Sequence, residues 1–149
     1  MLRVLLLLII VLNGTLHLFA NNIYSFTQIS LKDGLSQSNV SVTLRDSYGR
    51  LWIGTRDGLN LHDGYCIKNF FHSHRDDTSL PANSVYDLTE AKDSTILIAT
   101  AKGVVRYDER SDCFSPIYCD SKAVGFSNLC SVEGEIYVIG EDKNLSRVK

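Results

Sequence analysis

The densest run of polar side chains is His72–Asp77, in which two histidines stand two positions apart. Such a pair could contribute to a metal site, because neutral imidazole is a common zinc ligand. No third ligand stands at a spacing typical of such a site, so we interpret the run as a solvated loop. The chain also has no G-x-S-x-G nucleophile motif for Ser/His/Asp hydrolysis. We therefore predict no catalytic residues, no metal, no cofactor and no enzymatic activity.

Three aspartate–glycine pairs, at residues 33–34, 57–58 and 63–64, could suggest calcium binding. Calcium loops carry closely alternating Asp and Asn ligands, whereas these carboxylates are separated along the chain. Turn formation explains the pairs better, because Asp and Gly are both favoured in tight turns. The single tryptophan, Trp52, lies in a continuous apolar run. We expect it in the core between structural repeats rather than in a ligand site.

The four cysteines, Cys66, Cys113, Cys119 and Cys130, allow three disulfide pairings. Cys66 and Cys113 fall on predicted outer strands of different repeats, which argues against their pairing. An exported location permits disulfides, but a repeat fold with its own core does not need them. We therefore expect reduced or buried thiols.

The composition limits the class of protein. The chain has 149 residues, of which 44% are hydrophobic and 21% charged, and its formal net charge is −2. These proportions exclude a fully disordered chain, and the length fits one ordinary domain. No long basic run is present, so binding to nucleic acid or to a membrane surface through bulk charge is not expected.

Residues 1–20 have the pattern of a signal peptide. Arg3 precedes the apolar run Val4–Leu12, and the small residue Ala20 precedes two asparagines. The run is shorter than the roughly 20 residues that a membrane-spanning helix needs. We predict a signal-peptide helix over residues 1–20, cleavage near Ala20 and a periplasmic location. An uncleaved membrane anchor is the alternative, and it would export the rest of the chain as well.

The rest of the chain repeats itself. Shifted by 45 positions, Leu51–Thr55 falls on Ile96–Thr100, and Gly58 falls on Gly103. A further shift of 41 positions places Ile139-Gly140 at the same point of a third, weaker copy, on the second copy's residues 98–99. A period of about 40–50 residues with strand content is typical of propeller blades.

Each repeat consists of short predicted strands joined by tight turns, in which Gly58 and Gly103 are expected to be left-handed. The predicted strands are Val40–Arg45, Leu51–Thr55, Leu59–His62 and Cys66–Phe71, then Val85–Glu90, Ile96–Thr100, Val104–Tyr107 and Cys113–Tyr118. We predict an all-β fold: a partial β-propeller of about three four-stranded antiparallel blades in an open arc. A closing strand, which in a complete ring would finish the last blade, would lie within residues 21–32. The blades would span residues 33–78 and 79–120, with a partial third blade over residues 121–149.

The closing strand is predicted because two of its apolar residues have the spacing seen in the predicted fourth strand of a blade. Phe26 and Ile29 repeat the spacing of Ile67 and Phe70. We therefore expect Tyr24–Ser30 to be a strand without its native partner, which would pair with the last blade or hang free. Unpaired strand edges favour association. The expected partners are the remainder of a propeller or another copy of the chain.

The longest predicted loop indicates where a ligand would bind. In a meander, the turn between the second and third strands emerges at the same end as the connection to the next blade. That end carries the loop of residues 72–83, and long loops are where binding tends to occur. The candidate ligand-binding residues there are Arg56, Asp57, His74, Arg75 and Lys102. Solvated turn residues are the alternative interpretation for each of them.

The first repeat resembles the two-component regulator propeller repeat. The residues that carry the resemblance are Asp33–Ser36, Asn39-Val40, Asp46–Thr55, Gly58–Asn60 and Asp63-Gly64. The resemblance implies the periplasmic sensor part of a hybrid two-component histidine kinase, found in bacteria that digest complex glycans and responsive to a carbohydrate or its breakdown product. It supplies neither the ligand nor the residues that bind it.

The chain departs from that family plan, because beyond residues 1–20 it shows no apolar run of about 20 residues and no kinase motif. We expect the amino-terminal portion of a sensor or a truncated product, with an oligosaccharide or another periplasmic ligand as its partner. The alternative function is a structural or protein-interaction propeller in an envelope or secretion assembly. Neither function implies nucleic acid.

Overall fold

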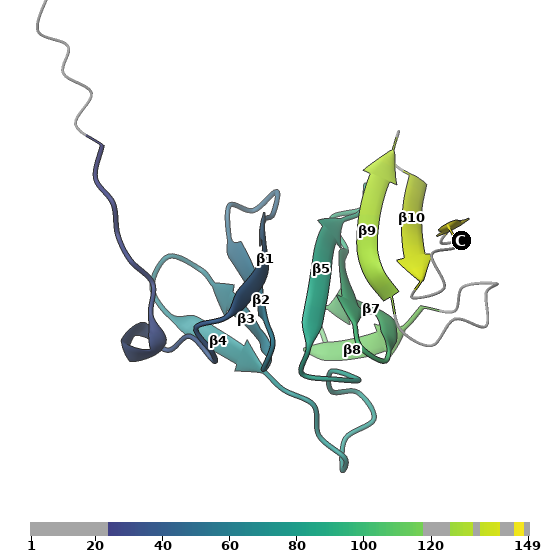
Figure 1. Ribbon diagram of the computed structural model, residues 1–149, viewed down its shortest axis with the longest axis horizontal. Coiled ribbons are helices and arrows are strands. Elements are labelled where there is room, and N and C mark those ends of the chain that lie inside the picture. Colours follow the sequence, from purple (N-terminus) through teal and green to yellow (C-terminus); the bar gives the residue numbers. More distant parts are fainter. Residues whose placement is uncertain (1–23, 118–125, 133–134, 141–144, 148–149) are drawn as a thin grey trace, which may run out of the picture.

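The computed structural model describes residues 24–117, 126–132, 135–140 and 145–147. A short 3-10 turn, η2 (Leu31–Asp33), precedes three antiparallel sheets (Figure 1). The first sheet consists of β1 (Val40–Arg45), β2 (Leu51–Thr55), β3 (Leu59–His62) and β4 (Ile67–Phe70). The second consists of β5 (Val85–Glu90), β6 (Ile96–Thr100), β7 (Gly103–Asp108) and β8 (Cys113–Pro116). The third consists of β9 (Phe126–Val132), β10 (Glu135–Gly140) and β11 (Leu145–Arg147). The predicted signal peptide lies outside the described residues.

The predicted strands are confirmed in the first two sheets. The bounds of β1, β2, β3, β5 and β6 agree to the residue, and those of β4, β7 and β8 differ by one or two residues. Gly58 and Gly103 have φ angles of 108° and 135°, so both predicted left-handed turns are present. No helix in the described part of the chain is long and apolar enough to cross a membrane.

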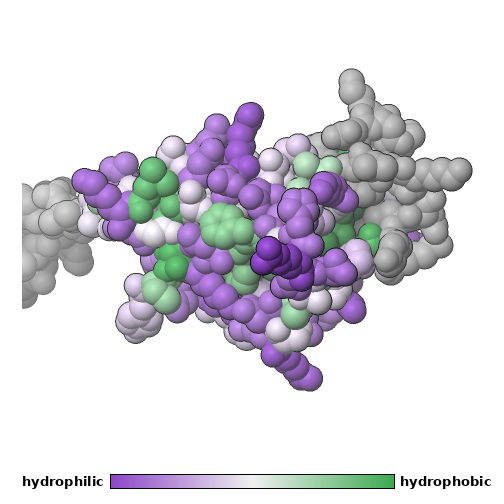
Figure 2. Space-filling view, turned by 90° about the horizontal axis from the view of Figure 1, so that it is seen from below, coloured by the Kyte–Doolittle hydropathy of each residue, from purple (hydrophilic) through white to green (hydrophobic). Residues whose placement is uncertain are grey.

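The three sheets stand face to face as propeller blades, and their first strands, β1, β5 and β9, lie side by side (Figure 1). One buried cluster joins Trp52 and Leu59 of the first blade to Val85, Ile98 and Tyr107 of the second, so Trp52 is a core residue as predicted. A second cluster lies between the second and third blades and consists of Leu97, Ala99, Val104, Leu129, Ile136 and Val138. Polar side chains cover most of the face drawn in Figure 2, with apolar surface exposed at the left, where the first blade lies. The fold is therefore the predicted arc of three propeller blades.

The first strand of each blade carries a β-bulge at the same place. In β1 the register shifts between Val40 and Val42, so Ser41 is the extra residue. Its hydroxyl lies 3.0 Å from the carbonyl of Gly54 and 2.6 Å from the carbonyl of Val85 in the next blade. The register shifts again at the corresponding points of β5 and of the β9–β10 pair. In β1 the bulge therefore places the Ser41 hydroxyl where it can join two blades.

The register of the third sheet corrects the predicted third copy. The bulge of β9 lies opposite Ile139-Gly140 of β10. The bulge of β5 lies opposite Ala99-Thr100 of β6 in the same way. Val138 therefore corresponds to Ile98, a shift of 40 positions rather than 41, and Val138 is fully buried. An error of one residue exchanges the two faces of a strand. The third copy lacks the threonine, Thr55 or Thr100, that ends this strand in the first two copies and fixes their alignment.

The predicted closing strand is not formed. Residues 24–30 form no strand, and Tyr24 and Phe26 are exposed. No strand pairs with this segment among the described residues, and a strand is stable only when a neighbour completes its hydrogen bonds.

The three described cysteines are free thiols, and two of them are exposed. Cys66, Cys113 and Cys130 are free thiols, as expected, yet Cys66 and Cys130 are exposed. Cys66 follows the exposed turn before β4, and Cys130 alternates along β9 with the buried Leu129, which places it on the opposite face. Cys119 lies outside the described residues.

Candidate functional site

The structure brings together two of the ligand-binding residues predicted from the sequence. His74 and Lys102 line a cavity of about 310 Å³ at the end of the blades that carries the long loop. Arg56, Asp57 and Arg75 do not line this cavity. The amide of Arg75 donates a hydrogen bond to the Ser73 hydroxyl within the same loop.

Arg56 and Asp57 join the first blade to the second. The Asp57 carboxylate accepts a hydrogen bond from Nδ2 of Asn83 at 2.8 Å, and the Arg56 carbonyl accepts one from the Ser84 hydroxyl at 3.2 Å. The amide of Gly58 also donates to the Asn83 carbonyl, at 2.8 Å. The β2–β3 turn therefore docks on the segment that enters β5, and these contacts are structural.

The long loop is held by its own hydrogen bonds and ring contacts. His72 Nδ1 lies 2.7 Å from the Leu80 carbonyl, which can only accept, so this nitrogen carries the hydrogen. The His74 ring packs edge-to-face on the His72 ring, with centroids 4.6 Å apart. His72 Nε2 is buried and has no hydrogen-bond partner within the described structure. Among the residues that the structure describes, no group of three or more His, Cys, Asp or Glu side chains could hold a metal ion.

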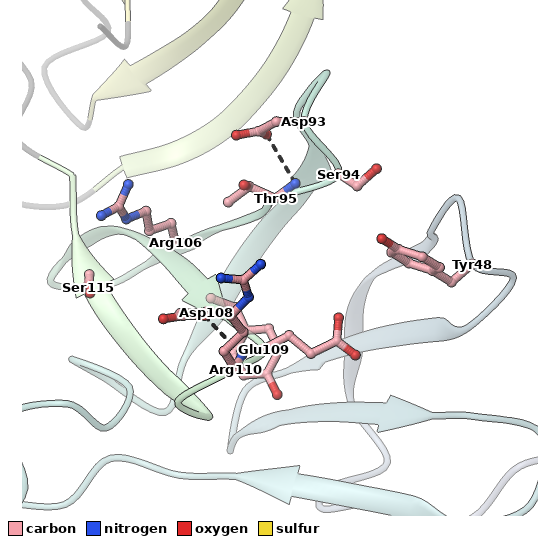
Figure 3. Close-up of a pocket in the computed structure, with 10 residues that line it drawn as sticks. Tyr48, Asp93, Ser94, Thr95, Arg106, Asp108, Glu109, Arg110 and Ser115 are labelled. Atoms are coloured by element: carbon pink, nitrogen blue, oxygen red, sulfur yellow. Dashed lines mark hydrogen bonds between the residues drawn. The ribbon is translucent and has the colours of Figure 1, made fainter.

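A larger cavity, of about 520 Å³, lies at the opposite end of the blades, and we call it the turn-end cavity (Figure 3). Turns of two blades form it: Tyr48 comes from the β1–β2 turn, and residues 93–95 come from the β5–β6 turn. The end of β7 and the following turn add Arg106–Arg110, and β8 adds Ser115. The lining is polar and carries both signs of charge.

Two aspartates of the turn-end cavity are fixed by hydrogen bonds from their own turns. The Asp93 carboxylate accepts the Thr95 amide at 3.2 Å, and the Asp108 carboxylate accepts the Arg110 amide at 2.9 Å and the Ser111 hydroxyl at 2.8 Å. The bond from the Thr95 amide lowers the pKa of Asp93, and the bond from the Ser111 hydroxyl lowers the pKa of Asp108. Both carboxylates are therefore ionised at neutral pH and are available as acceptors.

Arg50 holds Tyr48 at the rim of the cavity. Its Nε donates to Asp46 at 2.8 Å, and its Nη1 donates to Glu109 of the second blade. The guanidinium carbon lies 5.0 Å from the centroid of the Tyr48 ring, within the range of a cation–π contact. Tyr48 remains 69% exposed, so its ring offers an apolar platform beside the polar cavity.

The lining of the turn-end cavity suits the binding of a polar ligand. Arg106 and Arg110 supply hydrogen-bond donors, Asp93 and Asp108 supply acceptors, and Ser115 can act as either. Alternating donors and acceptors beside an aromatic ring match a ligand that carries many hydroxyl groups. Among the described residues, no histidine or cysteine lines this cavity.

The turn-end cavity was not predicted from the sequence, because the longer loop lies at the opposite end of the blades. Two signals could have pointed to it. Tyr48 and Asp93 stand 45 positions apart, so the repeat places them in equivalent turns of adjacent blades. Four of the five residues in Arg106–Arg110 are charged, which is dense for a short turn.

Comparisons with known proteins agree with the repeat. Residues 34–57 match the protein family described as "Two component regulator propeller". A protein named Histidine kinase P4, from Formosa agariphila, is 41% identical over 76 residues, which cover 42% of this chain and 6% of that protein.

Two solved structures from B. thetaiotaomicron share the fold. The extracellular domain of a putative hybrid two component system is 21% identical, with a TM-score of 0.67, over 75% of this chain and 17% of that one. The extracellular domain of a putative one component system is 19% identical, with a TM-score of 0.65, over 83% of this chain and 18% of that one. This chain therefore spans less than a fifth of the length of these proteins.

Proposed function

We propose that this chain, which contains a two-component regulator propeller repeat, is a ligand-sensing propeller segment of a hybrid two-component sensor. The observation that carries the proposal is the match of residues 34–57 to that repeat, within blades that resemble extracellular sensor domains. The 41% identity to a histidine kinase over 76 residues supports it. In such a sensor this segment would bind the signal, and phosphoryl transfer would take place in another part of the protein.

The proposed ligand is an oligosaccharide, and the proposed site is the turn-end cavity. Its volume of about 520 Å³ falls within the roughly 300–1,000 Å³ of small-molecule pockets. Ionised Asp93 and Asp108 would accept hydrogen bonds from ligand hydroxyls, and Arg106 would donate to ring and hydroxyl oxygens. The exposed Tyr48 ring would pack on the apolar face of a sugar ring.

The proposed location is the periplasm. Arg3, the apolar run Val4–Leu12 and Ala20 form a signal-peptide pattern, and the structural relatives are extracellular domains. Mass spectrometry of the protein recovered from a periplasmic fraction should show the loss of about twenty residues. Recovery of the unprocessed chain in the cytosol alone would contradict this location.

A glycan array probed with the purified chain tests the function. We expect binding of one oligosaccharide class, at least tenfold weaker in an Arg106→Ala variant and unchanged in a Lys102→Ala variant. Lys102 is the matched control because it lines the other cavity. Loss of binding in Lys102→Ala alone would move the site to the long-loop end. An array without a ligand would favour the alternative function, a structural or interaction module.

A further inference from the structure

The turn-end cavity has walls on two blades, and one arginine that is not among its lining residues contacts both walls. Tyr48 comes from the first blade and Glu109 from the second, and both line the cavity. The guanidinium carbon of Arg50 lies 5.0 Å from the centroid of the Tyr48 ring, and its Nη1 and Nη2 donate hydrogen bonds to the Glu109 carboxylate. Arg50 therefore fixes the position of one wall relative to the other.

Arg50 is itself held in place from the core side. Its Nε donates to Oδ2 of Asp46 at 2.8 Å, and the Asp46 side chain is fully shielded from solvent. The guanidinium carbon also lies 5.8 Å from the centroid of the ring of Trp52, which is fully buried. A planar guanidinium can meet two carboxylates and two aromatic rings at once, because it combines a rigid fork of donors with flat faces. The ammonium group of lysine cannot make this set of contacts.

The fold of a blade does not require this arginine. In the second blade Thr95 stands at the position of Arg50. The turn there still closes with a hydrogen bond from the Ala91 amide to the Thr95 carbonyl, just as the Asp46 amide donates to the Arg50 carbonyl in the first blade. Closure of the turn therefore does not account for the side chain of Arg50.

We propose that Arg50 is the positioning residue of the oligosaccharide site. It holds the Tyr48 ring in the place where that ring packs on a sugar, at a fixed distance from the polar wall of the second blade (Figure 3). The inference rests on the proposed function of the turn-end cavity. An exposed ring loses rotamer freedom when a ligand packs on it, which weakens binding, and a ring that Arg50 has already ordered loses less. Arg50 thus raises the affinity without touching the ligand.

Affinity measurements on four chains test whether Arg50 acts through Tyr48. The probe is the oligosaccharide that the wild-type chain binds most tightly on the glycan array, titrated by calorimetry. Arg50→Met should weaken binding by roughly fivefold, the effect of leaving one side chain to be ordered by the ligand. Tyr48→Ala should weaken it at least as much. The double variant should bind no more weakly than Tyr48→Ala alone, and multiplying effects of the two substitutions would contradict the proposal.

Two further chains separate positioning from stability. Lys68→Met removes another ion pair between the first two blades, Lys68 with Asp112, and should leave the affinity unchanged. Arg50→Lys keeps the positive charge without the planar fork and should not restore the wild-type affinity. Circular dichroism melting establishes that each chain is folded, and Arg50→Lys takes the place of Arg50→Met if the methionine variant is not. Equal losses of affinity in Lys68→Met and Arg50→Met would show that the arginine acts only by joining the blades.

The position of the Tyr48 ring is also measurable without ligand. NMR of the isotope-labelled chain should show nuclear Overhauser effects between the Tyr48 ring and the Arg50 side chain, and ring shifts distinct from those of Tyr65, which is 97% exposed. In Arg50→Met the Tyr48 shifts should move toward those of Tyr65. Tyr48 ring signals that do not change in Arg50→Met would overturn the proposal.

The outcomes distinguish this inference from the proposed function. A wild-type chain that binds no oligosaccharide of the array would contradict both together. Binding that is equally tight in the wild type and in Arg50→Met would contradict the role of Arg50 alone and would leave the proposed function standing.

Discussion

The indole nitrogen of Trp52 donates a hydrogen bond to Oδ2 of Asp46 at 2.9 Å, and both side chains are shielded from solvent. In the second blade the corresponding residues are Leu97 and Ala91. The tryptophan and its acceptor are therefore absent together. The carboxylate of Asp46 also accepts the amide of Arg50 at 2.9 Å, so one buried side chain closes the β1–β2 turn and satisfies the indole.

Asp46→Ala should destabilise the chain through Trp52. The substitution leaves a buried indole donor without an acceptor, at a cost of about 1–3 kcal/mol in the free energy of unfolding. In a Trp52→Leu background the same substitution should cost less, by about 0.5 kcal/mol or more, because the indole donor is already absent and only the contacts within the β1–β2 turn, chiefly those with Arg50, are lost. Urea denaturation of the four chains measures this coupling. Strictly additive costs would show that the indole bond contributes nothing.

Asp46 should also make stability depend on acid. Burial acts to raise its pKa, but hydrogen bonds from Trp52 and Arg50 outweigh burial, so the pKa lies below its ordinary value. A lowered pKa stabilises the fold above the unfolded-state pKa of about 4, and this stability is lost as pH falls through the folded-state pKa. Asp46→Asn should therefore lose less stability between neutral pH and pH of about 3 than the wild type does. Parallel losses in the two chains would contradict the assignment.

Alanine substitutions at Gly58 and Gly103 should differ in their cost to stability. Both have positive φ, but a Cβ on Gly58 would lie 2.9 Å from the Phe71 ring and 3.0 Å from the Phe70 carbonyl, whereas a Cβ on Gly103 meets nothing within 4 Å. Gly103→Ala should cost about 1–2 kcal/mol from the left-handed conformation alone. Gly58→Ala should cost more, because it adds a clash to the same strain, and Gly58→Val should cost more still. Melting curves of equal midpoint for the two alanine variants would contradict this difference.

Gly54→Ala should lower stability by disturbing the packing between the first two blades. Its Cβ would lie 2.7 Å from Cγ1 of both Val42 and Val85, and overpacking of this kind costs about 1–3 kcal/mol. Adding Val85→Ala should restore part of the loss, because it removes one of the two clashing methyl groups. Chemical denaturation of the single and double variants compares them. Failure of Val85→Ala to compensate would show that the glycine is needed for another reason.

The sequence predicted the fold well wherever the repeat was strong. Copies with apolar β-branched runs and glycine turns gave the bounds of β1, β2, β5 and β6 to the residue. The register of the third blade differs from the prediction by one residue, because Gly140 stands there in place of the threonine that the first two blades share, Thr55 and Thr100. Residues 24–30 had a strand pattern, but strand formation needs a partner that spacing alone cannot supply.

The candidate site was harder to predict than the fold. Loop length pointed to the end that carries His74 and Lys102, and the structure does gather these two side chains. The carbonyl of Arg56 and the carboxylate of Asp57 also contact Ser84 and Asn83 across a blade junction, which the sequence does not reveal. The larger cavity is built from short turns of two blades, and only the packing of those blades brings Tyr48 near Arg106–Arg110.

The central claim is that the turn-end cavity binds an oligosaccharide, and two-dimensional NMR of the isotope-labelled chain tests it most directly. The oligosaccharide selected by the glycan array is titrated into the protein, and shifts of the backbone amides are mapped. The claim predicts saturable shifts at Tyr48, Ser94 and Arg106, with His74 and Lys102 unmoved. Shifts confined to His74 and Lys102, or no saturable shift with any oligosaccharide of the panel, would contradict it.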